Sequence, residues 1–168
     1  MNRYTVGVLV RNQFGVLNRV TSMFRRRQFN ISALTVSETE STEYSRITVM
    51  FDGEENNKQQ LINQLYKLPD VCSISELDNE NSVSCELMLI KIQNDPETRS
   101  DIKAAADAFE AKTVDYSKDS IIFQLTGNSR RIDDFINLMR DYTILEICRT
   151  GNVSLEKGSS TIRKVTNL

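Results

Sequence analysis

Histidine is absent from this chain of 168 residues. The chain therefore has no imidazole that could act as a general base near neutral pH, and no Ser-His or Cys-His pair can form. A zinc site of the usual histidine and cysteine type is equally hard to assemble. Catalysis by carboxylates or lysines stays open, but the composition weighs against an enzyme. We predict no catalytic residue and no bound metal.

Long apolar runs are missing as well. No run approaches the roughly 20 residues that a membrane-spanning helix needs, and residues 1–10 lack the basic and then apolar sequence of a signal peptide. Cys72, Cys85 and Cys148 show no C-x-x-C spacing, so we expect reduced thiols that serve as packing residues. These absences indicate a cytoplasmic protein that does not contact a membrane.

An excess of basic residues is also lacking, because the formal net charge is −2 and the pI is near 5.3. This charge does not favour a nucleic-acid partner. Hydrophobic residues make up 39% and charged residues 26% of the chain, which is typical of a globular protein. The length allows one domain or two small ones.

The first half of the chain alternates strand-like and helix-like apolar patterns in the order βαββαβ. We expect strands at 3–10, 30–39, 44–52 and 71–77, and helices from Val16 and at 57–68. The first helix has apolar residues at 16, 17, 20, 23 and 24, which is the spacing of one helix face. Pro69 ends the second helix.

The same order recurs after a short polar linker at 78–82. The expected strands are 85–93, 112–116, 120–126 and 144–150, and the expected helices are 98–111 and 129–142. We therefore predict an α+β fold of two tandem ferredoxin-like βαββαβ domains, 1–78 and 83–157, followed by a flexible tail at 158–168. Each sheet has one face without helices, which favours pairing with a second copy or a partner.

The segment between the first strand and the first helix is the candidate binding loop. Gly15 lets a ligand approach the backbone closely, and the first amides of the helix favour a small anion or carboxylate. Asn12 can cap the helix or contact a ligand, and Asn30 offers a second amide side chain nearby. The same residues also fit plain turn-and-cap chemistry, and both interpretations remain open.

Residues 8–36, "VLVRNQFGVLNRVTSMFRRRQFNISALTV", closely resemble the N-terminal ACT domain of the small regulatory subunit of acetolactate (acetohydroxyacid) synthase. Further runs of the chain resemble later parts of that family: "QLINQLYKLPDVCSISEL", "ELMLIKI", "FQLTG" and "RTGNVSLEKG". The resemblance spans nearly the whole chain, and the spacing of its motifs is specific. It identifies the first domain as an ACT domain.

The resemblance implies a non-catalytic subunit that activates a large catalytic subunit and confers feedback inhibition by valine or a related branched-chain amino acid. Thiamine diphosphate, Mg²⁺ and FAD belong to that partner, and none to this chain. ACT domains of the family form side-by-side homodimers with the amino acid at the interface. The effector-binding residues carried over are Asn12, Gln13, Phe14, Gly15, Val16 and Leu17 of one chain, with Asn30 and Ile31 of the facing chain. Phe14 stands where the family often has proline or a small residue.

Three other functions deserve comparison. A stand-alone ACT-type amino-acid sensor would share the same loop without the catalytic partner. An RNA-binding plait would need aromatics on its central strands, where we find only Tyr4 and Phe51. An acylphosphatase-like enzyme would need an anion cradle, which Arg11 or Arg19 with Asn30 mimics only superficially.

Other charged features have a structural and a functional interpretation. The triplet 25–27 (Arg-Arg-Arg) either complements the end of the first helix or forms a docking patch for the large subunit. Arg46 either pairs with a carboxylate such as Glu38 or Glu40, which we favour, or contacts a partner. In the second domain, the loop 94–97 lacks glycine, so we expect an interface role there instead of ligand binding.

Overall fold

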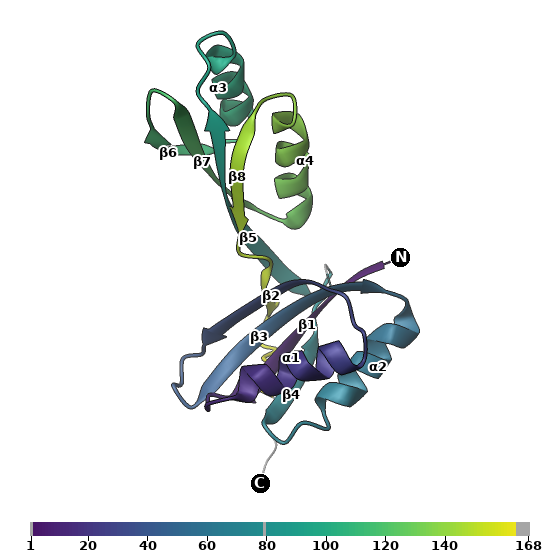
Figure 1. Ribbon diagram of the computed structural model, residues 1–168. Coiled ribbons are helices and arrows are strands. Elements are labelled where there is room, and N and C mark those ends of the chain that lie inside the picture. Colours follow the sequence, from purple (N-terminus) through teal and green to yellow (C-terminus); the bar gives the residue numbers. More distant parts are fainter. Residues whose placement is uncertain (1, 79, 164–168) are drawn as a thin grey trace. The chain divides into compact units, whose positions relative to one another are not determined.

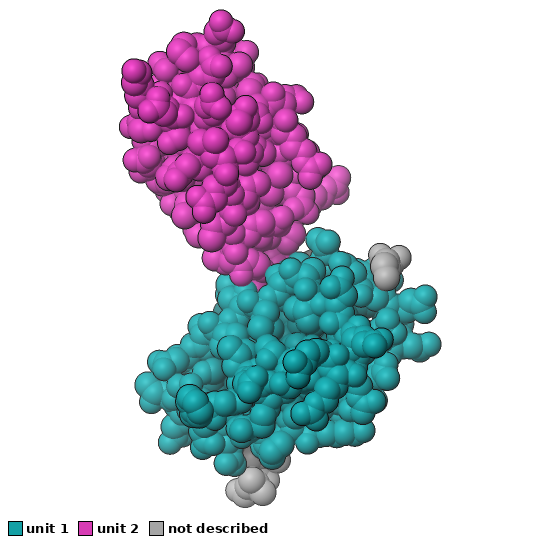
Figure 2. Space-filling model, viewed as in Figure 1, with its two compact units in different colours: residues 1–83, 153–168 teal, residues 84–152 magenta. Residues whose placement is uncertain are grey.

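The computed structural model describes residues 2–78 and 80–163. The chain divides into two compact units (Figure 2), which we call the first unit (1–83 with 153–168) and the second unit (84–152). None of the helices in these described ranges is both long and apolar enough to span a membrane.

The first unit is an antiparallel sheet covered on one face by two helices (Figure 1). Its elements are β1 (Asn2–Arg11), α1 (Val16–Arg26), β2 (Ile31–Glu38), β3 (Tyr44–Gly53), α2 (Glu55–Leu65) and β4 (Val71–Glu76). The strand order is β2-β3-β1-β4, so β2 and β4 are the edge strands. The predicted βαββαβ plait is confirmed for this unit.

Strand alternation and helix periodicity build the core of the first unit. Val6, Val8 and Val10 of β1 point to the helices and are at most 2% exposed, because alternate residues of a strand share a face. On α1, the predicted apolar positions are buried with one exception, since Leu17 is 42% exposed. Each buried aliphatic side chain contributes roughly 1.5–3 kcal/mol. The apolar face of α1 therefore fixes where the preceding loop lies.

The other face of this sheet, expected to be bare, is partly covered by residues 153–163. Arg46 Nη2 donates to the Ser154 carbonyl at 2.7 Å, and Ser75 Oγ donates to Glu156 Oε1 at 2.6 Å. Ile162 is only 8% exposed. The expected pairing of Arg46 with Glu38 or Glu40 is wrong, because a carbonyl from the end of the chain takes its place.

Two sequence expectations therefore differ from the structure at the end of the chain. Residues 153–163 group with the first unit, whereas we expected 153–157 in the second domain and a flexible tail at 158–168. Residues 164–168 of that expected tail lie outside the described residues. Arg163 forms an ion pair with Glu40 at 2.9 Å and stacks over the ring of Tyr44. The last residue of the expected linker, Ser82, already belongs to the next strand.

The second unit repeats the plait. Its elements are β5 (Ser82–Gln93), α3 (Arg99–Ala108), β6 (Lys112–Tyr116), β7 (Ser120–Gly127), α4 (Ser129–Met139) and β8 (Ile144–Arg149). The strand order is β6-β7-β5-β8. The unexpected short strand β9 (Val153–Glu156) pairs with β5, although its residues group with the first unit. Apolar residues of β5, β7, α3 and α4 form its separate core.

The cysteines do not pack inside. Cys72, Cys85 and Cys148 are free thiols and all exposed, so the expectation of packing residues is wrong. Cys72 and Cys148 lie on β4 and β8, which are edge strands. A side chain on an edge strand has a neighbouring strand on one side only and is more easily exposed. Apolar periodicity does not show which strands lie at the edge of a sheet.

Candidate functional site

The loop between β1 and α1 turns on Gly15. This residue has φ +81° and ψ −5°, in the left-handed region that glycine adopts without the steric cost of a Cβ. It is the residue that precedes α1, and no side chain caps the helix. Val16 N donates to the Gln13 carbonyl at 3.3 Å, which closes the turn.

This geometry leaves amides of the first helical turn open. Among the described residues, the backbone N–H groups of Leu17 and Asn18 have no acceptor, and the next amide, Arg19 N, bonds back to the Gly15 carbonyl at 3.0 Å. Unpaired amides at a helix N-terminus carry the positive end of the helix dipole. The loop can therefore accept a carboxylate without a change of fold.

Asn12 anchors the loop and does not cap the helix. Its side-chain amide donates to Glu38 Oε1 at 3.1 Å and to the Thr42 carbonyl at 2.9 Å. Its backbone N–H donates to the Glu43 carbonyl at 2.7 Å. The loop is thereby tied to the end of β2 and the turn that follows it.

The remaining loop residues divide between core and solvent. Val16 is 3% exposed and packs in the core, so only its backbone faces the loop. Phe14 points entirely into solvent, and Leu17 is 42% exposed. Gln13 is also exposed. An apolar ligand group thus meets Phe14 and Leu17 before any buried residue.

Asn30 and Ile31 lie at the other end of α1. Asn30 directly precedes β2, and eleven helical residues separate this point from the loop, which is about 16 Å at the rise of 1.5 Å per residue. The interpretation that placed Asn30 near the loop within one chain is therefore not supported. A ligand site that contains both the Gly15 loop and Asn30 therefore needs two chains.

Arg19 is a residue of this site that sequence reasoning did not assign to the effector. Its Nη1 lies 3.6 Å from the position that a Cβ on Gly15 would take, and its Nε bonds to Asp70 Oδ2 at 2.7 Å. The spacing of one helical turn from Gly15 was the available signal. Because Asp70 holds Arg19 and Asn30 is remote, the geometry does not support an acylphosphatase-like cradle.

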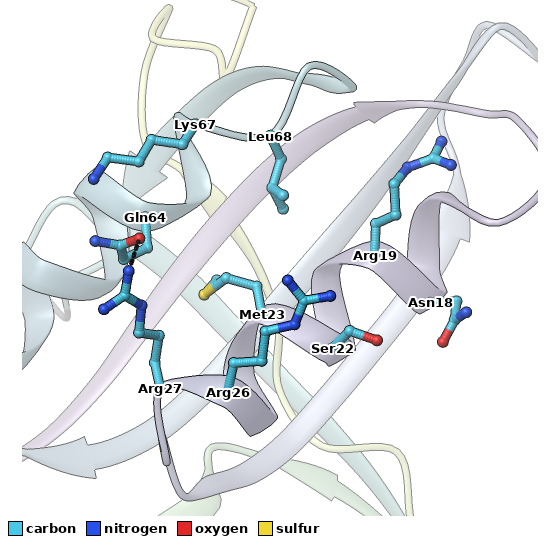
Figure 3. Close-up of a pocket in the computed structure, with 9 residues that line it drawn as sticks. All are labelled: Asn18, Arg19, Ser22, Met23, Arg26, Arg27, Gln64, Lys67 and Leu68. Carbon is cyan, nitrogen blue, oxygen red and sulfur yellow. Dashed lines mark hydrogen bonds between the residues drawn. The ribbon is translucent and has the colours of Figure 1, made fainter.

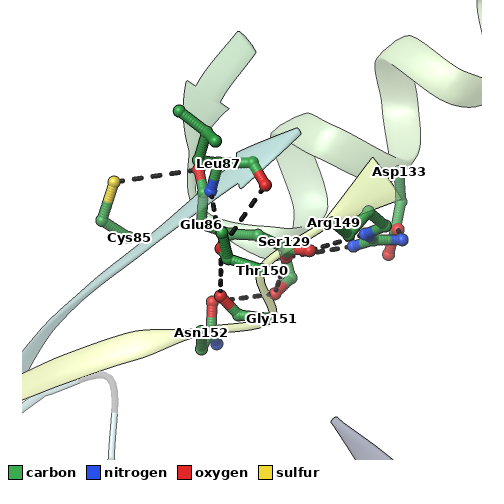
Figure 4. Close-up of polar contacts among 9 residues, drawn as sticks. All are labelled: Cys85, Glu86, Leu87, Ser129, Asp133, Arg149, Thr150, Gly151 and Asn152. Atoms are coloured by element: carbon green, nitrogen blue, oxygen red, sulfur yellow. Dashed lines mark hydrogen bonds and ion pairs between the residues drawn. The ribbon is translucent and has the colours of Figure 1, made fainter. Parts of the chain in front are cut away.

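The second unit contains a buried polar cluster around Glu86 (Figure 4). This carboxylate is 2% exposed and is bound by Arg149 through Nε at 2.5 Å and Nη2 at 3.0 Å. The Ser129 hydroxyl lies 3.1 Å from Glu86 Oε2 and from Asn152 Oδ1, and Arg149 Nη1 also bonds to Asp133 at 2.8 Å.

This cluster is closed by its own partners. The hydrogen bonds that Arg149 donates to Glu86 raise the pKa of the guanidinium above its usual value, against the effect of burial. Both carboxylate oxygens of Glu86 are occupied by protein donors, so the arrangement joins β5, α4 and β8. Within the described ranges, no group of three His, Cys, Asp or Glu side chains is placed to hold a metal ion.

The chain has an α+β fold of two plaits, and in the first plait a left-handed glycine precedes a first helix whose N-terminal amides are open. This is the architecture of an ACT-domain protein. Residues 6–73 match the family model of the ACT domain found in small subunits of acetohydroxyacid synthase, and residues 85–158 match that of the small subunit of acetolactate synthase. The chain belongs to the acetolactate synthase small subunit family.

Individual relatives agree with this assignment. The chain is 43% identical to a probable acetolactate synthase small subunit of Archaeoglobus fulgidus over 94% of its length and 98% of the relative's. It is 41% identical to the Bacillus subtilis small subunit, covering 92% of this chain and 90% of that one. The crystal structure of the Thermotoga maritima small subunit superposes with a TM-score of 0.86 at 34% identity, covering 95% of this chain and all of that one.

Proposed function

We propose that the chain is a regulatory subunit that activates a catalytic acetolactate synthase partner and confers feedback inhibition by valine or a related branched-chain amino acid. The carrying observation is the loop at Gly15, with its left-handed backbone and two unpaired amides. The chain itself contributes no catalytic residue, in keeping with the absence of histidine. Thiamine diphosphate, Mg²⁺ and FAD are held by the catalytic partner.

The loop suits one end of an amino acid. The amides of Leu17 and Asn18 bind the carboxylate, and the guanidinium beside Gly15 adds positive charge. The ammonium group needs acceptors, which main-chain carbonyls and the side-chain oxygen of Asn30 provide. The aliphatic side chain lies against exposed apolar atoms of the loop, where each buried methylene contributes about 0.8 kcal/mol.

A second copy of the chain completes the site. β2 is an edge strand whose outer side is unpaired among the described residues. Asn30 precedes its first residue, whereas Asn12 is bonded to Glu38 at its last. Antiparallel pairing of two β2 strands places the start of one beside the end of the other. Asn30 of one protomer then approaches the binding loop of its partner, which supports a homodimer with the effector at the interface.

Binding at a dimer interface gives feedback a physical route. An amino acid that contacts both chains stabilises one arrangement of the two protomers over others. Coupling of this kind is typically about 1–3 kcal/mol and is reciprocal, so the active holoenzyme binds valine less well than the inhibited one. Discrimination by one methylene amounts to only about 1–3 kcal/mol, so leucine and isoleucine must be compared with valine directly.

The test is calorimetric titration of the protein with valine, leucine and isoleucine, together with an assay of the catalytic partner. Gly15→Asp is the decisive variant, because it places a side chain at φ +81° and a negative charge at the open amides. Gly158→Asp is the matched control, since Gly158 has φ +70° and open space around it. We expect valine binding and valine inhibition to disappear in Gly15→Asp and to persist in Gly158→Asp.

The titration tests amino-acid binding, and the assay tests activation of the catalytic partner. Stimulation of the catalytic partner without saturable amino-acid binding would refute the effector site and leave an activating subunit. Amino-acid binding without any stimulation would indicate a stand-alone sensor.

A further inference from the structure

A groove lies between α1 and the end of α2, and Asn18 and Arg19 at its one end adjoin the binding loop (Figure 3). It has a volume of about 430 Å³. Its lining residues are Asn18, Arg19, Ser22, Met23, Arg26, Arg27, Gln64, Lys67 and Leu68. Four of these nine side chains are cationic and none is acidic, in a chain whose net charge is −2.

Three of these four cations have no acidic partner among the described residues. Arg19 is bound to Asp70, but Arg27 donates only to the neutral amide of Gln64 at 3.1 Å. Among the described residues, Arg26 and Lys67 have no hydrogen-bond or ion-pair partner. Both side chains are exposed. The groove therefore presents cations that are free to bind an outside carboxylate.

The floor of the groove is apolar. Met23 is 8% exposed and belongs to the core, and Leu68 packs against that core from the α2 side. In Figure 3, Met23 and Leu68 lie between the basic side chains of the two helices. A partner that fills the groove thus needs an apolar side chain flanked by negative charges.

The backbone of the groove disfavours a small phosphate-like ion. The amides that follow the two helices are bonded internally, with Arg27 N on the Met23 carbonyl and Lys67 N on the Gln64 carbonyl. Leu68 N bonds to Leu65 O. Around Arg26, Arg27 and Lys67 the groove therefore lacks the free N–H groups of a cradle that holds a compact anion. The open amide of Asn18 lies at the other end of the groove, towards the binding loop.

We propose that this groove docks an acidic segment of the catalytic partner, with Asp or Glu side chains on Arg26, Arg27 and Lys67 and an apolar residue over Met23. The proposal rests on the proposed function, which supplies the partner. Arginine favours such a contact because its planar guanidinium binds carboxylates through two hydrogen bonds.

The experiment measures the dissociation constant between this protein and the catalytic subunit at two ionic strengths. The test variant is Arg26→Glu/Lys67→Glu. The control is Lys103→Glu/Arg130→Glu, which makes the same charge change at exposed positions of α3 and α4. We expect at least about tenfold weaker binding for the test variant and little change for the control. Added salt should weaken the wild type more than the test variant.

Several outcomes overturn the proposal. Equal affinities of wild type and test variant would exclude the groove while leaving the proposed function intact, and equal losses in both variants would show a general charge effect. No binding by the wild type would refute both. If inorganic phosphate competes with the partner beyond a chloride control of equal ionic strength, the groove is a small-ion site. Valine titration and thermal unfolding of each variant verify that the first unit is folded.

Discussion

The loops that enter the first helix of each unit differ although both units have the same fold. In the first unit, Gly15 turns the chain and leaves two amides open. In the second unit, Asn94 is 4% exposed, donates to the Ser117 carbonyl at 2.6 Å and accepts from Arg99 at 2.7 Å. Asp95 accepts bonds from the amides that follow it. One loop is open to a ligand, and the other satisfies its own polar groups.

This contrast shows that the plait does not by itself create a binding site. The proposed site depends on a left-handed residue that opens the turn and leaves two amides at the start of α1 without an acceptor among the described residues. In the second unit the equivalent polar groups hold the structure together. Charged residues there act in the same way, since the buried Glu86 is paired with the partly exposed Arg149.

The largest effect that would sharpen this contrast is expected for Arg149→Met. The substitution leaves the Glu86 carboxylate buried without its charge partner, which typically costs about 3–5 kcal/mol of unfolding free energy. Hydrogen exchange followed by mass spectrometry should show the loss in the second unit, with protection of the first unit and valine binding unchanged.

Arg130→Met is the control. Arg130 is an exposed residue of α4 in the same unit, and its substitution removes the same charge. The double variant Glu86→Leu/Arg149→Met should recover much of the stability, since no buried charge remains. If Arg149→Met lowered the unfolding free energy by less than about 1 kcal/mol, the pair of Glu86 and Arg149 would not stabilise the second unit.

The sequence predicted the order of elements but not these long-range contacts. The apolar spacing of Val16, Val20 and Phe24 is a local pattern, and all three are buried as expected. In contrast, Glu86 and Arg149 are 63 residues apart, and Arg46 and Ser154 are 108 apart. No local periodicity connects such residues, because their contact depends on how strands pair. The sequence signal was limited to a charged residue, Glu86, within the largely apolar strand β5.

The same limit applied to the binding loop. The glycine and the helix start were readable from sequence, and so was the lack of glycine in the second loop. The role of Asn12 was not, because its partners Glu38 and Thr42 come from the distant end of β2. The position of Asn30 at the far end of α1 likewise follows only from the folded helix.

A smaller effect is expected when the two loop asparagines are compared directly. Asn94→Ala removes a buried donor and acceptor and should cost about 1–3 kcal/mol in the second unit. Asn12→Ala should cost less than about 1 kcal/mol, because its side-chain bonds are exposed to solvent. The effect on valine affinity should be the opposite: Asn12→Ala should bind valine more weakly, and Asn94→Ala should bind it as tightly as the wild type.

Hydrogen exchange of each unit provides the stability values. If Asn94→Ala weakened valine binding as strongly as Asn12→Ala, the second loop would take part in effector binding, and the contrast between the units would be lost.

The smallest effect on stability is expected for Phe14→Ala. The ring is fully exposed in the protomer, so its removal should change the unfolding free energy by no more than about 0.5 kcal/mol. An apolar ring left in water is instead available to a second protomer. We therefore expect the dissociation constant of the homodimer to rise at least about fivefold, as measured by sedimentation. Tyr116→Ala, at an exposed aromatic of the second unit, should leave it unchanged. Tighter valine binding with unaltered dimerisation would instead show that Phe14 narrows the effector pocket.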